Sequence, residues 1–210
     1  MKAFIINFNL LTWPEKLAED LYKRGCEVIF VDNNSTYRPL LDWYKSCPYK
    51  VIRSEENHLS IAFGQLGLQH TFDDRYFIIT DPDLDISRVP EDFINILLGG
   101  LALHANVLKA GLSLEISDLP VNPMTYKVIE HESMFWEHEG KSIFYRADIG
   151  TTLAVYDRTR FHLPYLSGVR AGHPYTAKHL PWYLTLENLT PEYKNYIATS
   201  KWVGWQTLIS

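Results

Sequence analysis

Short apolar runs alternate with amphipathic segments through the first half of the chain. Runs of strand length, rich in β-branched and aromatic residues, occur at residues 2–7, 26–35, 49–54 and 76–80. Helix-like segments at residues 14–25, 37–47 and 59–72 separate them, and Gly64 and Gly67 weaken the last one. This order predicts an α/β fold with one Rossmann-like domain, in which helices flank both faces of a central, mostly parallel mixed sheet.

The second half of the chain is less regular. We expect a helix at residues 89–105, because Pro90, Glu91 and Asp92 suit a helix amino terminus, and strands at residues 107–120 and 144–158. From His162 onward the chain is rich in Pro, His, Tyr and Trp. A polar helix candidate at residues 190–200 and an apolar end follow, which is typical of a domain cut from a longer polypeptide.

Composition narrows the classes of partner. The 210 residues carry a formal net charge of −5, so a nucleic-acid-binding surface is not expected. Cys26 and Cys47 have no metal-ligand spacing, which indicates a reducing compartment. Because no segment reaches the roughly 20 apolar residues of a transmembrane helix, we expect a cytoplasmic protein without a transmembrane segment that acts on a small molecule.

Three carboxylates follow the fourth apolar run. The stretch "YFIITDPDLDIS" places Asp81, Asp83 and Asp85 at the carboxyl end of a strand, and Asp32 ends the second strand. Parallel strands end at one edge of the sheet, where ligands bind. Carboxylates that repel one another usually share a cation, and hard oxygen ligands favour Mg²⁺ or Mn²⁺. The alternative is a turn in which Pro82 fixes the backbone and the aspartates cap nearby amides.

Three classes of enzyme place carboxylates at a strand end. A dinucleotide oxidoreductase needs a glycine-rich turn after the first strand, and "NFNLLTWP" contains no glycine. A haloacid-dehalogenase-like phosphatase would use Asp81 as its nucleophile, but such a motif normally lies on an early strand. A nucleotide-sugar transferase, with an Asp-x-Asp motif midway along the chain, fits best.

The segments "FIINFN", "VIFVDNNST", "YFIITDPDLDIS", "GLSLEISDLP", "TTLAVYDR" and "YTAKHLPWY" resemble GT-A fold glycosyltransferases over nearly the whole chain. More narrowly, they resemble the amino-terminal domains of multidomain chlorella-virus glycosyltransferases that build capsid glycans, which implies the host cytoplasm. The resemblance implies one domain over residues 1–210, with a nucleotide-binding half at 1–105 and an acceptor-side half and tail at 106–210, and further domains in a full-length chain.

The resemblance also implies a donor and its ligands. The donor would be a UDP-sugar, held with Mn²⁺ or Mg²⁺, and the acceptor a glycan or glycoprotein. The residues implied near the nucleotide are Phe8, Asn9, Leu10, Thr12 and Asp32. Asp81 and Asp83 match the metal motif, and Asp81 also borders the donor. Asp32 has a structural alternative as part of a turn with Asn34 and Ser35, and Phe8 and Leu10 have one as core.

The carboxyl-terminal tail concentrates cations in an otherwise acidic chain. Lys178 and His179 lie in "AKHLPWY", a segment that resembles a recurrent part of the family. We expect both near the donor diphosphate and His179 as a further metal ligand, with His173 as the alternative ligand. Among the aromatic residues of the tail, which include Trp202 and Trp205, we expect Trp182 to lie near the ligand.

Two carboxylates outside the metal motif are candidate catalytic groups. Asp118 lies in "SDLP" and Asp148 in "RADIGTT", and an inverting transferase needs such a base at the acceptor hydroxyl. Relatives commonly carry Asp where this chain has Gly150. The resemblance implies a hexosyl- or deoxyhexosyltransferase, with retention of stereochemistry slightly favoured. The alternatives are a nucleotide-sugar-binding module without turnover and a phosphatase that uses Asp81.

Overall fold

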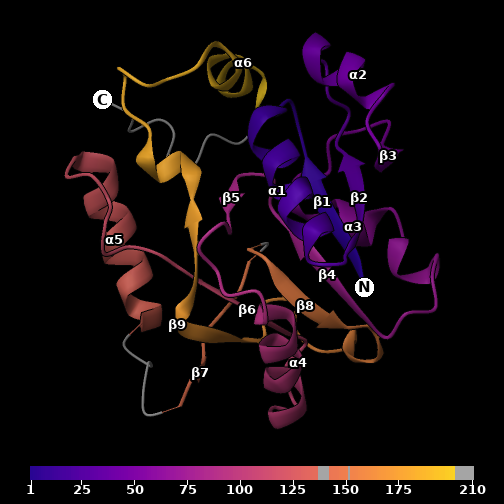
Figure 1. Cartoon of the computed structure of the whole chain (residues 1–210), viewed down its shortest axis with the longest axis vertical. Coiled ribbons are helices and arrows are strands. Elements are labelled where there is room, and N and C mark those ends of the chain that lie inside the picture. The colour runs from indigo at the N-terminus through magenta and orange to yellow at the C-terminus, as the bar shows by residue number, and fades with distance from the viewer. Residues whose placement is uncertain (137–141, 151, 202–210) are drawn as a thin grey trace.

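The computed structural model describes residues 1–136, 142–150 and 152–201. Its first half is a parallel sheet in which the strands lie in the order β3–β2–β1–β4 (Figure 1). These strands are β1 (Lys2–Asn7), β2 (Glu27–Asp32), β3 (Lys50–Arg53) and β4 (Tyr76–Thr80). Side chains on both faces of β1 are buried, as continuous apolar runs in a parallel sheet require. The four strands expected in the first half are confirmed.

The second half continues the sheet with mixed strand directions. β8 (Ala154–Asp157) lies antiparallel between β4 and β6 (Lys109–Leu114), and β9 (Gly168–His179) pairs in parallel with β6. The short strands β5 (Leu84–Asp85) and β7 (Phe144–Arg146) pair with β9 in the antiparallel direction. The single strand expected at residues 144–158 was wrong, because the chain leaves the sheet between β7 and β8.

Helices cover both faces of this sheet. Apolar side chains of α1 (Thr12–Lys23), α4 (Phe93–Leu103) and α5 (Pro123–Trp136) share one core with one face, and Trp43 and Tyr44 of α2 (Arg38–Tyr44) pack against it. On the other face lie α3 (Ala62–Gln65) and the 3-10 turn η2 (Leu68–His70). None of the helices in the described ranges is long and apolar enough to cross a membrane.

The helix expected at residues 59–72 is broken into short pieces. The 3-10 turn η1 (Leu59–Ile61) precedes α3, and η2 follows it. Leu59 has a φ of 56° and Gly67 a φ of 62°, both in the left-handed region that a helix cannot include. The side chain of Asn57 accepts the amide hydrogen of Leu59, and Asn33 donates to the Leu59 carbonyl. These bonds hold a backbone conformation that the apolar pattern did not reveal.

The last helix packs on the first. The 3-10 turns η3 (Arg158–Arg160) and η4 (Leu180–Tyr183) precede α6 (Pro191–Thr199), which lies beside the start of α1 (Figure 1). No side chain of the chain just before α1 caps its amino terminus. Instead the carboxylate of Glu192 accepts hydrogen bonds from the amides of Leu11 and Thr12, at 2.8 and 3.0 Å. The tail therefore satisfies the free amides of a helix 180 residues earlier in the chain.

Candidate functional site

A cavity of about 480 Å³ lies at the point where the strand order reverses, between the carboxyl ends of β1 and β4. In open α/β sheets this is the place where ligands bind. We call it the β1–β4 cavity. Its walls are Ile6, Phe8, Asn33, Asn57, Leu59, Ser60, Asp81, Pro82, Asp83, His179, Tyr196 and Ser200.

The acidic motif forms one wall of this cavity. Asp81 and Asp83 both line it, whereas Asp85 does not and instead accepts a hydrogen bond from the amide of Ser87 at 2.8 Å. The capping alternative describes Asp85. Asp83 is 6% exposed, and burial raises the pKa of its carboxyl group to about 7. Its Oδ1 is buried without a hydrogen bond in the described part of the chain.

His179 faces this carboxylate from the end of β9. Its Nε2 lies 3.5 Å from Asp83 Oδ1. Burial lowers the pKa of His179 to about 4, so the contact is not an ion pair at neutral pH. Trp182 packs its ring against the imidazole at 4.7 Å, and fixes it from the side without lining the cavity. Trp202 and Trp205 lie outside the described residues.

The Oδ1 of Asp83 and the Nε2 of His179 lie 3.5 Å apart, and both can ligate a divalent cation when the carboxyl group is ionised and the imidazole proton is on Nδ1. The carboxylate of Asp81 lies on the same wall of the cavity. Carboxylate and imidazole suit Mn²⁺, which also accepts phosphate oxygens. Within the described ranges no group of three His, Cys, Asp or Glu side chains is arranged to enclose a metal ion. A cation here would therefore need ligands from a bound molecule.

Lys178, the other side chain expected near the donor diphosphate, does not line the cavity. Lys178 precedes His179 on β9 and points to the opposite side, where its Nζ contacts Oδ2 of Asp118. No lysine or arginine belongs to the cavity wall among the residues that the structure describes. His173 is exposed, and stacks on Trp136 with ring centroids 5.0 Å apart. Of the two histidines weighed as ligands, only His179 lines the cavity.

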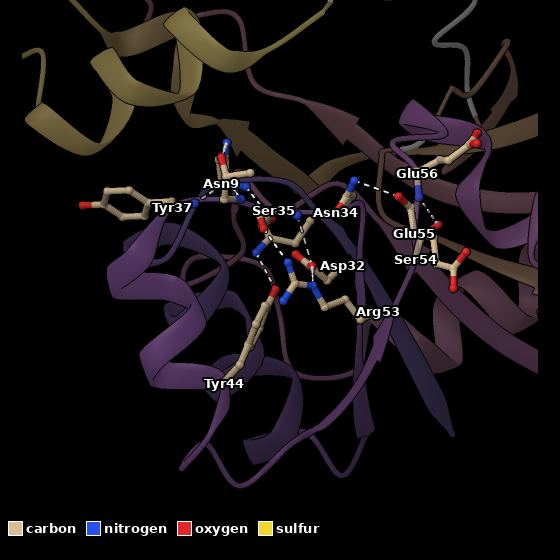
Figure 2. A network of polar contacts seen from close by, with 12 residues as sticks. Asn9, Asp32, Asn34, Ser35, Tyr37, Tyr44, Arg53, Ser54, Glu55 and Glu56 are labelled. Atoms are coloured by element: carbon tan, nitrogen blue, oxygen red, sulfur yellow. Dashed lines mark hydrogen bonds and ion pairs between the residues drawn. The ribbon is translucent and has the colours of Figure 1, made fainter.

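Asp32 lies beneath the cavity rather than in its wall. Figure 2 shows its carboxylate at the centre of a polar network, where Oδ2 accepts from the amide of Ser35 at 3.2 Å and lies 3.1 Å from Nε of Arg53. The side chain is 0% exposed, and burial raises its pKa against the effect of these partners. The turn interpretation describes this arrangement, and the neighbouring Asn33 takes the place in the wall.

The loop after β1 contributes one of its four expected residues to the wall. Phe8 lines the cavity, and its ring meets that of Tyr196 edge to face at 6.4 Å. Asn9 is buried with a φ of 52°, and donates from Nδ2 to Oγ1 of Thr199 at 2.7 Å. Leu10 packs in a small core, and the hydroxyl of Thr12 donates to Glu192 at 2.7 Å. Asn9, Leu10 and Thr12 thus hold α6 in place.

The two candidate catalytic carboxylates lie outside the β1–β4 cavity. Asp118 accepts from the hydroxyl of Tyr183 at 2.5 Å as well as from Lys178. Partial burial alone would raise the pKa of Asp118, but the hydrogen bonds from Lys178 and Tyr183 outweigh it and the pKa is lowered. Asp148 is exposed and borders a separate depression with Arg146 and Phe135. Their roles stay predictions.

Sequence reasoning missed part of the wall. Asn57, Leu59 and Ser60 come from the irregular segment that was expected to be a helix, and Tyr196 and Ser200 come from α6 and the residue after it. Burial raises the pKa of Tyr196 to about 12, which keeps its hydroxyl neutral. An aromatic residue in a polar helix was the only signal for Tyr196, and no local signal marked Leu59.

Comparison with known proteins identifies the fold. Neither protein-family models nor curated protein sequences match this chain. Among solved structures, GalNAc-T7 with UDP, GalNAc and Mn²⁺ is similar over 93% of this chain and 47% of that one, with a TM-score of 0.57 at 15% identity. Residues 1–349 of TarS from S. aureus are similar over 86% of this chain and 60% of that one, with a TM-score of 0.50 at 11% identity.

Both proteins are GT-A glycosyltransferases. This chain spans about half of GalNAc-T7 and three fifths of the TarS fragment. The mixed sheet, its flanking helices and these likenesses show that the chain has a GT-A fold.

Proposed function

We propose that this chain is a metal-dependent glycosyltransferase that moves a sugar from a UDP-sugar to a glycan or glycoprotein acceptor. One observation carries the proposal: buried Asp83 Oδ1 and neutral His179 Nε2 face each other at 3.5 Å beside Asp81, in a cavity at the strand-order reversal. The GT-A fold supports it, and so does the presence of UDP and Mn²⁺ in the similar structure of GalNAc-T7.

The charges of the cavity indicate how a diphosphate would bind. Asp81 and Asp83 are acidic, His179 is neutral, and no cationic side chain belongs to the described wall. A diphosphate would be repelled unless a divalent cation joined it to the carboxylates. When bound, the cation would neutralise the charge that develops on the departing diphosphate. We infer an absolute requirement for the cation.

The rest of the wall suits a nucleoside. Phe8 and Tyr196 present aromatic surface to the cavity, and Asn33, Asn57 and Ser60 bring polar groups. A cavity with apolar walls and a few convergent polar groups is typical of a small-molecule site. We place the base and ribose between these residues and the diphosphate at Asp81 and Asp83. Retention of stereochemistry, a hexosyl or deoxyhexosyl group and the chlorella-virus resemblance stay predictions.

A thermal-shift titration with UDP, GDP and CMP tests the proposal, each with and without Mn²⁺. A ligand at about 100 times its dissociation constant adds about 2.7 kcal/mol to stability. We expect stabilisation by UDP with Mn²⁺ only, and its loss in Asp83→Ala but not in Asp85→Asn, which serves as the matched control. Equal stabilisation with and without the metal would contradict the role of the carboxylates. Release of phosphate from a monoester would instead indicate the phosphatase.

Gly150 favours a second candidate, a nucleotide-sugar-binding module without turnover. The family resemblance implies Asp at this position, and a Cβ added to Gly150 would meet no atom within 4 Å. The site therefore has room for the carboxylate but does not carry it. UDP-sugar binding without any hydrolysis or transfer, together with turnover gained in Gly150→Asp, would establish the module.

A further inference from the structure

Lys109, on the central strand β6, is the one lysine among the fully buried side chains of the described residues, and it is 0% exposed. Its Nζ donates to the carbonyl of Gly150 at 2.6 Å and to the hydroxyl of Tyr156 at 3.0 Å. It also lies over the ring of Tyr156 at 4.9 Å and that of Tyr165 at 4.1 Å. One carbonyl, one hydroxyl and two aromatic faces thus enclose the amine.

This cage is unusual because it holds no carboxylate. Its hydrogen bonds within the described ranges go to a carbonyl and a hydroxyl and not to a carboxylate, although a buried lysine is normally paired with one. Burial lowers the pKa of Lys109 to about 7, and the charges of Asp81 and Asp148 act in the opposite direction. Both carboxylates are therefore within electrostatic range. A leucine or methionine would fill the same space without this desolvation cost.

The bond to Gly150 shows what the lysine does for the backbone. Residues 147–150 leave the sheet after β7, and β8 begins at Ala154, opposite Ile79 of β4. In an antiparallel pair the chain just before Ala154 runs alongside the chain just after Ile79, which is where Asp81 lies. The amine that binds the Gly150 carbonyl also lies within electrostatic range of Asp81, so residues 148–150 lie in the neighbourhood of the acidic motif. Two side chains tie the backbone of this segment to the sheet: Lys109 of β6 donates to the Gly150 carbonyl, and Arg170 of β9 donates twice to the Asp148 carbonyl.

We propose that Lys109 is a positioning residue, whose amine fixes residues 148–150 beside the wall that carries Asp81. The inference rests on the proposed function and extends it. Residues 148–150 do not line the β1–β4 cavity, so the clamp does not set the affinity for UDP. It sets the place of Asp148 and of the Gly150 backbone relative to the donor sugar and its acceptor. Such a clamp affects turnover rather than nucleotide binding.

The test compares Lys109→Met with Ser113→Ala. Ser113 lies on the same strand, is 0% exposed, and its hydroxyl bonds the Ala171 carbonyl at 2.7 Å and the Tyr145 hydroxyl at 2.5 Å, so its variant also loses two buried hydrogen bonds. Three readouts are measured on the whole chain: amide hydrogen exchange of the peptide with Asp148, Ile149 and Gly150, the dissociation constant for UDP with Mn²⁺, and UDP release from UDP-glucose, UDP-galactose and UDP-N-acetylglucosamine.

In Lys109→Met we expect exchange in that peptide at least tenfold faster, a dissociation constant for UDP within twofold of wild type, and a kcat for UDP release at least tenfold lower. Ser113→Ala should match wild type in all three. Tyr156→Phe keeps the ring and the Gly150 bond but removes the hydroxyl, and should show about a threefold effect on exchange and kcat. This variant decides the question if Lys109→Met does not fold.

Unchanged exchange and kcat in Lys109→Met would overturn the inference, and so would an equal loss of kcat in Ser113→Ala. In both cases the wild type still binds UDP with Mn²⁺, so the proposed function survives. If the wild type binds no UDP under any condition, the proposed function fails and the role in turnover fails with it. Faster exchange with unchanged kcat would reduce Lys109 to a structural residue and overturn the inference alone.

Discussion

Asp83→Asn should stabilise the metal-free protein at alkaline pH while it abolishes metal binding. The carboxyl group of Asp83 is 6% exposed, its Oδ1 has no hydrogen bond in the described chain, and burial raises its pKa from 3.8 to about 7. Without a cation, ionisation leaves a buried and uncompensated charge. Asparagine removes that charge and keeps the shape of the side chain.

The sign and the size follow from proton linkage. The folded state holds the Asp83 proton to higher pH than the unfolded state, so its contribution is fully present below about pH 4 and is lost as the pH rises to about 7. A shift from 3.8 to about 7 corresponds to about 4 kcal/mol. Asparagine does not titrate. The free energy of unfolding of the variant, relative to wild type, should therefore rise by about 4 kcal/mol between pH 4 and pH 8.

Urea unfolding in the presence of a chelator, at a series of pH values, measures this difference. His179 contributes a slope of the opposite sign, because its lowered pKa costs stability as the pH falls from 6.5 to about 4. Because His179 lies 3.5 Å from Asp83, its pKa is measured by NMR in both proteins and its slope is subtracted from the difference. Asp85→Asn, outside the cavity, is the control and should give a flat difference. With Mn²⁺ and UDP in excess, only wild type should gain stability at pH 8.

A difference that is equal at pH 4 and pH 8 would refute the reasoning. It would mean that Asp83 ionises as easily in the folded protein as in the unfolded chain, and the orphaned carboxylate would no longer indicate a cation. Stabilisation of Asp83→Asn by Mn²⁺ and UDP as strong as that of wild type would remove its role as a ligand.

Three further predictions test other parts of the site. Glu192→Ala removes the acceptor of the amides at the start of α1 and of the Thr12 hydroxyl. We expect it to lower the free energy of unfolding, measured in urea, by about 1.5–3 kcal/mol. A loss below about 0.5 kcal/mol would show that Glu192 does not stabilise the contact between α6 and α1. His179→Ala should lose the stabilisation by UDP with Mn²⁺ in a thermal-shift assay, whereas His173→Ala, outside the cavity, should keep it; equal loss in both would show that neither effect is local. Tyr196→Leu should weaken UDP binding in calorimetry by about 1–3 kcal/mol, the value of one stacked base, and Tyr196→Phe should bind like wild type; equal affinities in both variants would show that the ring does not contact the nucleotide.

The parallel half of the fold could be predicted because its signal is local. Strands β1, β2 and β4 are buried on both faces, so each reads as a continuous apolar run bounded by helix and turn signals, whereas the edge strand β3 is short and only half-buried. The same signal placed Asp81 and Asp83 at a strand end, and the topology rule placed that end at the edge where ligands bind. The acidic wall of the cavity followed from these two steps.

The strand β9 could not be predicted in this way. Its sequence "GVRAGHPYTAKH" contains Pro174, and proline within a run argues against a strand. The pairing with β6 shows how the residue is accommodated: Leu112 lies opposite Ala171, but the next residue, Ser113, lies opposite Thr176. The residues between bulge out of the ladder. The register shift depends on a partner strand more than 50 residues away, which no local pattern records.

The remaining wall of the cavity depends on tertiary packing as well. Tyr196 reaches the cavity only because Glu192, one helical turn earlier, binds the start of α1 and Thr199, one turn later, accepts from Asn9. The loop after β1 was expected to bind the nucleotide itself. Instead most of it positions the helix that completes the wall, while Phe8 alone faces inward.

The charges of the cavity connect these features into one mechanism of recognition. The described wall carries two carboxylates and a neutral imidazole, and the buried amine of Lys109, which does not line the cavity, donates to the carbonyl of Gly150. A diphosphate alone adds negative charge to a negative wall, and a cation alone finds only Asp83, His179 and Asp81. The cation supplies the positive charge that the diphosphate needs, and the diphosphate supplies further oxygen ligands to the cation. Binding of UDP and Mn²⁺ should therefore be strongly cooperative, with each raising the affinity for the other by the same factor.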